Sequence, residues 1–375
     1  MPSSTTFAQR LDARVAEALD KRLVDRISTG SGRGVARVLA FALVTPVHLV
    51  GLALAFAGVA LLVLGSGWWD RAIAVLVLAV AWLVRPHLLH GVDPDSVRVE
   101  PTAAPTYTAL VAEIAELLGT RPPTELRIDT SFNAYVGNHG LRGRQLVVGA
   151  PLWAAFGPQE RVSLLGHEIG HLAHGDLLSS RYVGGGYRTL VRWIELLDPA
   201  ATEVFEHDTP ITVRALMAPP RWLVRGYLRL LWSVNSASSR RQELYADLAA
   251  AMVAGTDATV SDHELILLGD SIEVVGNRAA MDARRPDLRE AIAERVAGYD
   301  AGQRTAARRA AAEDRRSIDA THPPTVDRLR LVESVERSLP AIVLDPARSR
   351  RIDQELAPAL DEAFKRLGDA YRYVH

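Results

Sequence analysis

The chain has 375 residues, a net charge of −1 at pH 7 and no cysteine. Its length suits one large domain or two. The nearly balanced charge excludes a strongly basic, nucleic-acid-binding surface as the main feature of the protein. Because cysteine is absent, disulfides and thiolate metal sites are excluded. Any bound metal must therefore be held by histidine and carboxylate side chains.

Residues 1–37 are polar and charged, and their apolar side chains recur at helical spacing. These apolar positions are Leu11, Val15, Leu19, Leu23 and Ile27. The pattern predicts an amphipathic segment that lies in the cytoplasm or at a membrane interface. The segment lacks the short basic start and early apolar core of a signal peptide.

Residues 38–89 predict a hairpin of two membrane spans. The stretch from Val38 to Leu64 contains no Asp, Glu, Lys or Arg and exceeds the roughly 20 residues that cross the hydrocarbon core. The second apolar run, residues 72–84, is shorter. It crosses only if its helix extends from about Trp68 to Leu89 and the flanking arginines reach the interface. The alternative for this run is a buried helix of a soluble domain.

Basic residues set the expected orientation of the hairpin. Lys21, Arg22, Arg26, Arg33 and Arg37 precede the first span, Arg85 follows the second, and Arg71 lies in the turn. The positive-inside rule then places both ends of the hairpin in the cytoplasm. The Ala- and Arg-rich composition resembles that of a GC-rich bacterium. The expected location is the bacterial inner membrane, with a multi-pass anchor and a cytoplasmic domain over residues 90–375.

The beginning of that domain combines helix and strand patterns. Residues 106–119 have helical periodicity. Residues 124–129 and 145–149 predict strands, with residues 137–143 as the loop between them. A small sheet within a mainly helical domain is therefore expected.

The stretch VSLLGHEIGHLAHGD contains His167, Glu168 and His171 in the spacing H-E-x-x-H. Residues four apart lie one above the other on a helix, so both imidazoles can bind one metal ion. Glu168 lies one step round the helix, where it can act as general base on a metal-bound water. Gly166 and Gly170 beside the histidines predict the close approach of another backbone or a substrate. The alternative is a solvated helix with two histidines by chance.

The region after this helix is less regular. Gly184, Gly185 and Gly186 predict a flexible or close-packed break. Residues 198–220 contain four prolines and predict an irregular segment. Residues 221–234 carry an arginine at every fourth position, with tryptophan and leucine elsewhere. That arrangement is typical of an amphipathic helix lying in the membrane interface rather than spanning the bilayer.

A third ligand is needed to complete a metal site on the H-E-x-x-H helix. A metzincin would need glycine and histidine where this chain has His174 and Leu177, which excludes that class. The stretch SRRQELYADLAA places Glu243 and Asp247 on one helix face. Glu243 can complete a two-histidine, one-glutamate site, and Asp247 can accept the second ring N–H of a ligand histidine. The alternative is an ordinary pair of surface acids.

The C-terminal part of the chain is predicted to be helical. Residues 326–338 and 348–373 have amphipathic patterns. Residues 301–319, rich in alanine, arginine and acids, fit either a solvated helix or a mobile loop over a cleft. The histidines outside the motifs are expected to be ordinary polar side chains: His139, His174, His207, His263 and His375.

Together the motifs resemble the HtpX and type I CaaX prenyl protease family of membrane zinc metallopeptidases. The resemblance covers residues 124–331, and its specificity comes from four blocks that occur in the family's order. The blocks are Phe132-Asn133-Ala134-Tyr135 with Leu146-Val147-Val148-Gly149, then HEIGH, then Ser239-Arg240 with Glu243 and Ala246-Asp247, then Thr321-His322-Pro323-Pro324 through Arg328-Leu329.

The resemblance implies a complete catalytic site. It implies one zinc ion per chain, bound by His167, His171 and Glu243. Its catalytic residues would be Glu168 as base and His322 and Arg328 as oxyanion donors. The alternative for the last block is a helix-entry turn at His322 with Arg328 in a local contact.

The resemblance also implies where a substrate lies. Asn133 resembles the family's substrate-contacting asparagine, and the strand pair that includes Val147 and Val148 borders the cleft. An exposed strand edge there can bind an extended peptide by strand addition. The alternative for Asn133 is an ordinary turn residue.

The expected fold is mainly α with a small β-sheet, in a membrane-anchored gluzincin-type domain. The expected activity is zinc-dependent hydrolysis of peptide or membrane-protein substrates, in membrane-protein quality control or processing. The alternatives are a non-catalytic scaffold or chaperone with structural zinc, and a CaaX-type processing protease. Glu168 favours an enzyme, because a structural zinc site needs no general base.

Overall fold

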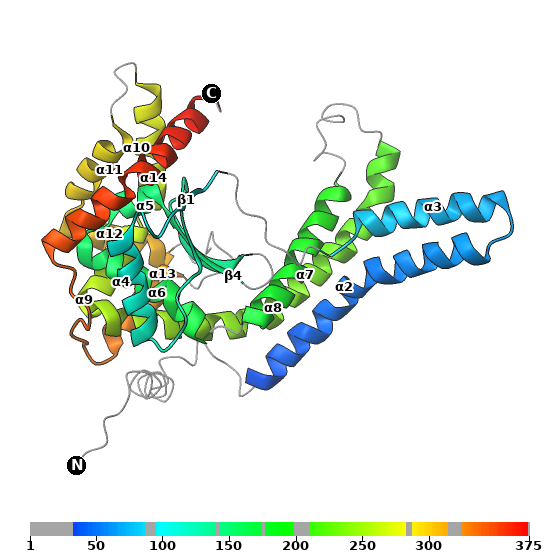
Figure 1. Ribbon diagram of the computed structural model, residues 1–375, viewed down its shortest axis with the longest axis horizontal. Coiled ribbons are helices and arrows are strands. Elements are labelled where there is room, and N and C mark those ends of the chain that lie inside the picture. The colour runs from blue at the N-terminus through cyan, green and yellow to red at the C-terminus, as the bar shows by residue number, and fades with distance from the viewer. Residues whose placement is uncertain are drawn as a thin grey trace, which may run out of the picture. The chain divides into compact units, whose positions relative to one another are not determined.

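The computed structural model describes residues 33–86, 95–139, 143–174, 177–198, 211–282, 287–313 and 324–373. The chain is mainly helical with one small sheet, which confirms the predicted fold class (Figure 1). The amphipathic pattern predicted for residues 1–37 lies largely outside the described residues. Two compact units are present. Among the described residues, one comprises parts of 91–175 and 239–375, and the other comprises parts of 30–90 and 176–238.

The first unit contains a four-stranded sheet. Its strands are β1 (Val97–Val99), β2 (Glu125–Asp129), β3 (Ala134–His139) and β4 (Gly143–Gly149), in the spatial order β1-β2-β4-β3. β2 and β4 are parallel, whereas β1 and β3 pair antiparallel to their neighbours. β3 therefore lies at an edge of the sheet, and β4 is paired on both sides.

The loop predicted over residues 137–143 is shorter in the structure. Gly137 pairs with Gln145, and His139 pairs with Gly143. Pairing in this hairpin satisfies backbone groups that a loop would leave to solvent. The prediction missed β3 because its sequence, AYVGNH, lacks a clear alternation of apolar and polar residues.

Helices cover this sheet and close the first unit (Figure 1). They are α4 (Pro105–Leu117), α5 (Ala150–Ala155), α6 (Pro158–His174), α9 (Thr256–Ile266), α10 (Gly269–Met281), α11 (Leu288–Ala297), α12 (Ala301–Glu313), α13 (Thr325–Ser334) and α14 (Pro346–Tyr373). Residues 301–313, which could have been a solvated helix or a mobile loop, form the helix α12, and none of its side chains is buried.

The helix α6 is fixed by the core and by one polar anchor. Its residues Leu165 and Ile169 are fully buried in the main apolar cluster. Near its start, Arg161 is 2.7 Å from Asp353 of α14, and the same carboxylate accepts a hydrogen bond from the indole of Trp153 at 3.1 Å. These contacts, at the start and in the middle of α6, determine the direction in which its remaining face points.

The second unit is built around α2 (Arg33–Leu64) and α3 (Trp68–Leu83). Within the described ranges, one helical segment, Val38–Leu64, is long and apolar enough to cross a membrane by length and composition. α3 has 16 residues and is about 24 Å long, shorter than the predicted 68–89. It packs closely on α2, because a Cβ at Gly58 would lie 2.7 Å from the side chain of Leu78.

The helix α7 (Leu177–Leu196) also belongs to this second unit. It continues without a break through Gly184–Gly186, which corrects the break predicted there. A Cβ at Gly186 would lie 2.7 Å from Val44, so this glycine permits close packing. The Tyr182 hydroxyl lies 2.9 Å from the Thr45 hydroxyl, and its carbonyl oxygen lies 3.0 Å from His48 Nε2. Polar contacts thus hold α7 against α2.

The helix α8 (Ile211–Ala254) is longer than predicted. It includes residues 211–220, expected to be irregular, and passes through Pro219 and Pro220. Each proline lacks a backbone N–H and so cannot donate a helical hydrogen bond, whereas the residues of the surrounding turns keep their N–H donors. Among the described residues, 177–198 and 211–238 belong to the compact unit of α2 and α3; the sequence analysis placed them in the domain over residues 90–375.

We expect reporter fusions after Gly67 and after His375 to lie on opposite sides of the membrane. In this expectation α2 would supply one crossing, and α3, which runs back alongside α2 (Figure 1), would supply the second. Alkaline phosphatase should be active after Gly67 only, and a cytoplasmic reporter after His375 only. The same side for both fusions would contradict a second crossing by α3.

Candidate metal centre

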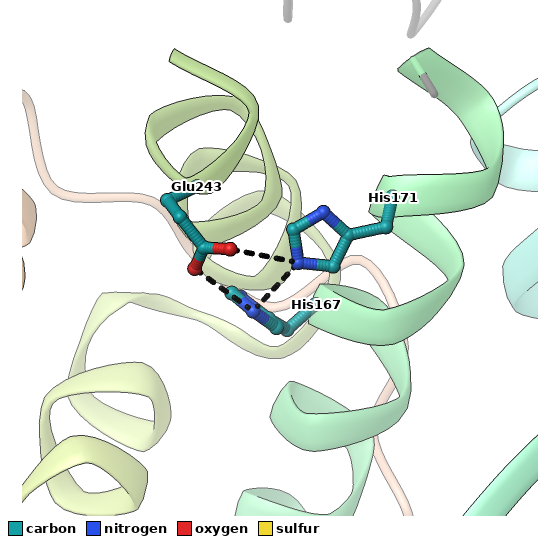
Figure 2. A group of neighbouring side chains, drawn as sticks. All are labelled: His167, His171 and Glu243. Carbon is teal, nitrogen blue, oxygen red and sulfur yellow. Dashed lines mark hydrogen bonds and ion pairs between the residues drawn. The ribbon is translucent and has the colours of Figure 1, made fainter. Parts of the chain in front are cut away.

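Two histidines of α6 and one glutamate of α8 converge in the first unit (Figure 2). The Nε2 atoms of His167 and His171 are 3.1 Å apart. Glu243 Oε1 lies 3.4 Å from His171 Nε2, and Glu243 Oε2 lies 3.6 Å from His167 Nε2. One donor atom from each residue lies within 4.8 Å of the other two. Two imidazole nitrogens and a carboxylate in this arrangement fit the ligand set of a catalytic zinc site.

Small residues allow the two helices to meet at this point. A Cβ at Gly170 would lie 3.1 Å from the Cβ of Ala249 and 3.2 Å from the Cα of Ala246. A Cβ at Gly166 would lie 3.2 Å from the Cα of Ala250. The close backbone expected beside the two glycines is therefore that of α8. This contact brings Glu243 within reach of both histidines.

We expect Gly170→Val to weaken metal binding by separating α6 from α8. Valine adds three carbons where the first already meets α8 at 3.1 Å, so the helices must move or the side chain must strain. Gly170→Ala should have a smaller effect in the same direction. Zinc affinity measured by chelator competition tests this. Gly226→Val is the matched control, because nothing lies within 4 Å of its Cβ position on α8; equal losses in both valine variants would contradict the steric argument.

Asp247 lies behind the ring of His167 and is fully buried. Its Oδ1 is 3.0 Å from His167 Nδ1. Because an ionised carboxylate only accepts hydrogen bonds, Nδ1 carries the proton of His167. The lone pair of Nε2 is then left for a metal, the arrangement found in metal-ligating histidines that have a carboxylate partner.

A buried arginine from α13 holds Asp247 in place. Arg328 Nη2 lies 2.5 Å from Asp247 Oδ1, and Arg328 Nε lies 3.0 Å from Oδ2. Burial alone would raise the pKa of Asp247, but the charge of Arg328 and the contacts with His263 and His167 hold it well below its usual range. Burial opposes the charge of Arg328, but its pairing with Asp247 raises its pKa. Asp247 therefore stays an acceptor for His167.

His263 of α9 is a further partner of Asp247 that the sequence analysis missed. Its Nε2 lies 3.2 Å from Asp247 Oδ1, and its Nδ1 lies 2.7 Å from the carbonyl oxygen of Thr259. The ring is 1% exposed, so it is not the ordinary polar side chain expected. No spacing signal could have identified it, because the contact depends on how α9 packs against the other helices.

We expect His263→Ala to lower zinc affinity about tenfold, because outer partners of metal ligands typically contribute 10–100-fold. Loss of this contact leaves Asp247 and the His167 ring less well fixed. His263→Gln, which retains a side-chain donor, should recover part of the affinity. Chelator competition on the folded variants provides the measurement. Unchanged affinity in His263→Ala would exclude a positioning role for this residue.

The remaining predicted site residues lie in different environments. Glu168 follows His167 on α6 and is 5% exposed. Arg328 was expected to stabilise an oxyanion, but both its Nε and its Nη2 bind Asp247, and Nη2 is also 3.2 Å from His167 Nδ1. This arrangement gives Arg328 a positioning role, and its expected role as an oxyanion donor stays a prediction. His322 lies outside the described residues.

The residues expected to bind substrate lie at and beside the start of β3. Asn133 is exposed and immediately precedes β3; its side-chain oxygen accepts a hydrogen bond from Ala134 N at 2.9 Å. Val147 and Val148 are buried in β4, whose backbone is paired to β2 and β3. Direct substrate contact by these two valines is incompatible with that burial. The sheet edge beside them belongs to β3.

Comparison with known proteins agrees with this geometry. Residues 101–336 match the sequence profile of Peptidase family M48. "Protease HtpX homolog" of Thermoplasma volcanium is 30% identical over 184 residues, covering 48% of this chain and 56% of the relative. "Protease HtpX" of Pseudomonas entomophila is 30% identical over 161 residues, covering 40% and 52%.

A second archaeal relative, "Protease HtpX homolog 2" of Sulfurisphaera tokodaii, is 30% identical over 161 residues, covering 42% of this chain and 47% of its own. The chain spans about half the length of the curated relatives it matches. The family match covers well over half of this chain and includes both helices of the candidate metal centre. The resemblance inferred from the motifs is thereby confirmed, and the chain belongs to peptidase family M48.

Proposed function

We propose that this protein is a membrane-anchored zinc endopeptidase. The observation that carries the proposal is the convergence of His167, His171 and Glu243 beside the buried Glu168. Zinc bound by these three residues would lower the pKa of a water molecule to about 7 and polarise the substrate carbonyl. Structural zinc sites usually have four protein ligands and need no general base, so this residue set favours an enzyme over a zinc-stabilised scaffold.

Glu168 would be the general base. Its carboxylate takes a proton from the attacking water and passes it to the leaving amine, so one group serves both halves of the reaction. The Asp247–Arg328 pair would keep the His167 ring in one orientation and one tautomer throughout. His322 and Arg328 remain the proposed oxyanion donors on the basis of the family resemblance.

The substrate would be an extended peptide added to the edge of β3 opposite β4. β3 is an edge strand of the sheet, and α6 packs against it. Backbone pairing along this edge would hold a peptide independently of its sequence. Asn133 would contact the peptide where it passes the start of β3, whereas Val147 and Val148 would support that edge from β4.

The proposed location is the bacterial inner membrane with the catalytic unit in the cytoplasm. The span Val38–Leu64 supports the membrane anchor, and the distribution of arginines and lysines supports the orientation. The substrates would be membrane proteins or peptides, in quality control or processing. Cleavage of CaaX-type C-terminal motifs is the competing specificity within the same chemistry.

Peptide cleavage by the full-length, detergent-solubilised protein tests this function. We expect cleavage of unfolded protein or peptide substrates, complete inhibition by a zinc chelator, and recovery after zinc is added back. The internal bond cleaved, identified by mass spectrometry, separates an endopeptidase from a C-terminal processing protease. Cleavage that survives removal of zinc would contradict the proposal.

A further inference from the structure

A cavity of about 370 Å³ lies beside the segment that leads into β3. Its volume is at the lower end of the usual range of small-ligand pockets, about 300–1,000 Å³. It lies within the first unit, between the Thr130–Phe132 segment, the start of α5, and helices α10, α11 and α14. None of the residues described above at the metal centre lines it.

Two aromatic rings pack against two glycines of α10 that line this cavity. A Cβ at Gly269 would lie 3.2 Å from the ring of Phe132, and a Cβ at Gly276 would lie 2.7 Å from the ring of Tyr371. The two glycines are seven residues apart and so lie on one helix face. Substituting either would displace an aromatic ring of the cavity.

The cavity has an apolar floor and an acidic rim. Ile272 and Ile292 belong to the buried core, whereas Asp270 and Glu273 are exposed. Glu273 and Tyr371 both line the cavity, and burial together with the charge of Glu273 raises the pKa of Tyr371. No basic side chain is among the lining residues.

Residues that line the cavity directly precede the proposed substrate-binding strand β3 in the sequence. Ser131 and Phe132 line the cavity, and Asn133 and β3 follow directly. Asn133 O accepts a hydrogen bond from Gly149 N at 2.8 Å, so this segment keeps running beside the end of β4. A peptide extended along β3 advances about 3.3 Å per residue, and two residues past the start of β3 it would reach the level of Phe132.

We propose that this cavity is a specificity pocket for a lysine or arginine side chain of the peptide substrate. The apolar floor would cover the methylene stem, the rings of Phe132 and Tyr371 would attract the cation through their faces, and Asp270 and Glu273 would neutralise it. Like-charged glutamate or aspartate side chains would be repelled. This inference rests on the proposed endopeptidase function only for the path of the peptide along β3.

Two parallel measurements on the full-length zinc-loaded protein test the pocket. The first is cleavage of a peptide series in which each position in turn is lysine, arginine, norleucine or glutamate. The second is binding of the same peptides to Glu168→Gln, followed by fluorescence anisotropy. At one position we expect kcat/KM and affinity to be about tenfold higher for lysine or arginine than for norleucine, the size expected for partly exposed charge pairs with a cation–π contact.

Charge variants identify the groups responsible. Asp270→Asn with Glu273→Gln should abolish the lysine-to-norleucine ratio, and Glu273→Lys should shift the preference towards glutamate. The control pair, Glu100→Gln with Glu116→Gln, removes two exposed charges elsewhere on the same unit and should keep the ratio.

The outcomes separate this inference from the proposed function. Cleavage without a basic preference at any position would overturn the pocket and leave the peptidase in place. Binding with a basic preference that depends on Asp270 and Glu273, but with no cleavage by the wild type, would support the pocket and contradict the peptidase. A ratio that falls equally in the control pair would also overturn it, because a general charge effect would then explain the preference.

Discussion

Replacing Glu168 with glutamine is expected to reduce peptide hydrolysis by about 10³–10⁴-fold, at the upper end of the contribution of a general base. Glutamine retains the shape of the side chain and its capacity for hydrogen bonding, but it cannot take a proton from water. The loss should appear in kcat, because the base acts only as the transition state forms. KM should change little.

The zinc content of Glu168→Gln should equal that of the wild type, because Glu168 is not one of the three clustered ligand residues. Glu160→Gln is a matched control, since Glu160 lies in the first turn of the same helix and has no proposed role. Its activity should remain that of the wild type. Equal hydrolysis by Glu168→Gln and the wild type would remove the base mechanism, whereas loss of zinc would show that Glu168 acts through the metal site.

Glu243→Ala is expected to abolish stoichiometric zinc binding. The wild type should bind about one zinc per chain, and its affinity should fall more than 100-fold in the variant, which exceeds the largest usual effect of an outer partner. Glu243 faces both ligand histidines at 3.4 and 3.6 Å. Its removal leaves two neutral donors and no ligand charge to balance the metal ion.

Metal analysis after dialysis against a weak chelator measures this loss. Gln242→Ala is the control, because Gln242 is the exposed neighbour of the ligand on the same helix. The two variants should have the same helical content by circular dichroism. Full zinc content in Glu243→Ala would exclude Glu243 as a ligand and would require another carboxylate in that position.

The sequence by itself determined the parts of the site that follow from helical periodicity. His167 and His171 face one way because residues four apart share a helix face, and the same rule pairs Glu243 with Asp247. Composition alone identified the candidate span Val38–Leu64, because the cost of burying charge in a bilayer depends on residue type and segment length. These inferences need no knowledge of which helices meet.

The tertiary structure decided which elements meet. Arg328 and His263 bind Asp247 only because α13 and α9 pack beside the crossing of α6 and α8, and no spacing in the chain encodes those contacts. β3 is the edge strand because a short hairpin brings it onto β4. Backbone periodicity relates residues within one helix or strand, whereas contacts between elements depend on side-chain fit across the whole core. The glycines next to His167 and His171 connect both levels: their positions were readable in the sequence, but only the structure shows that α8 fills the space they leave.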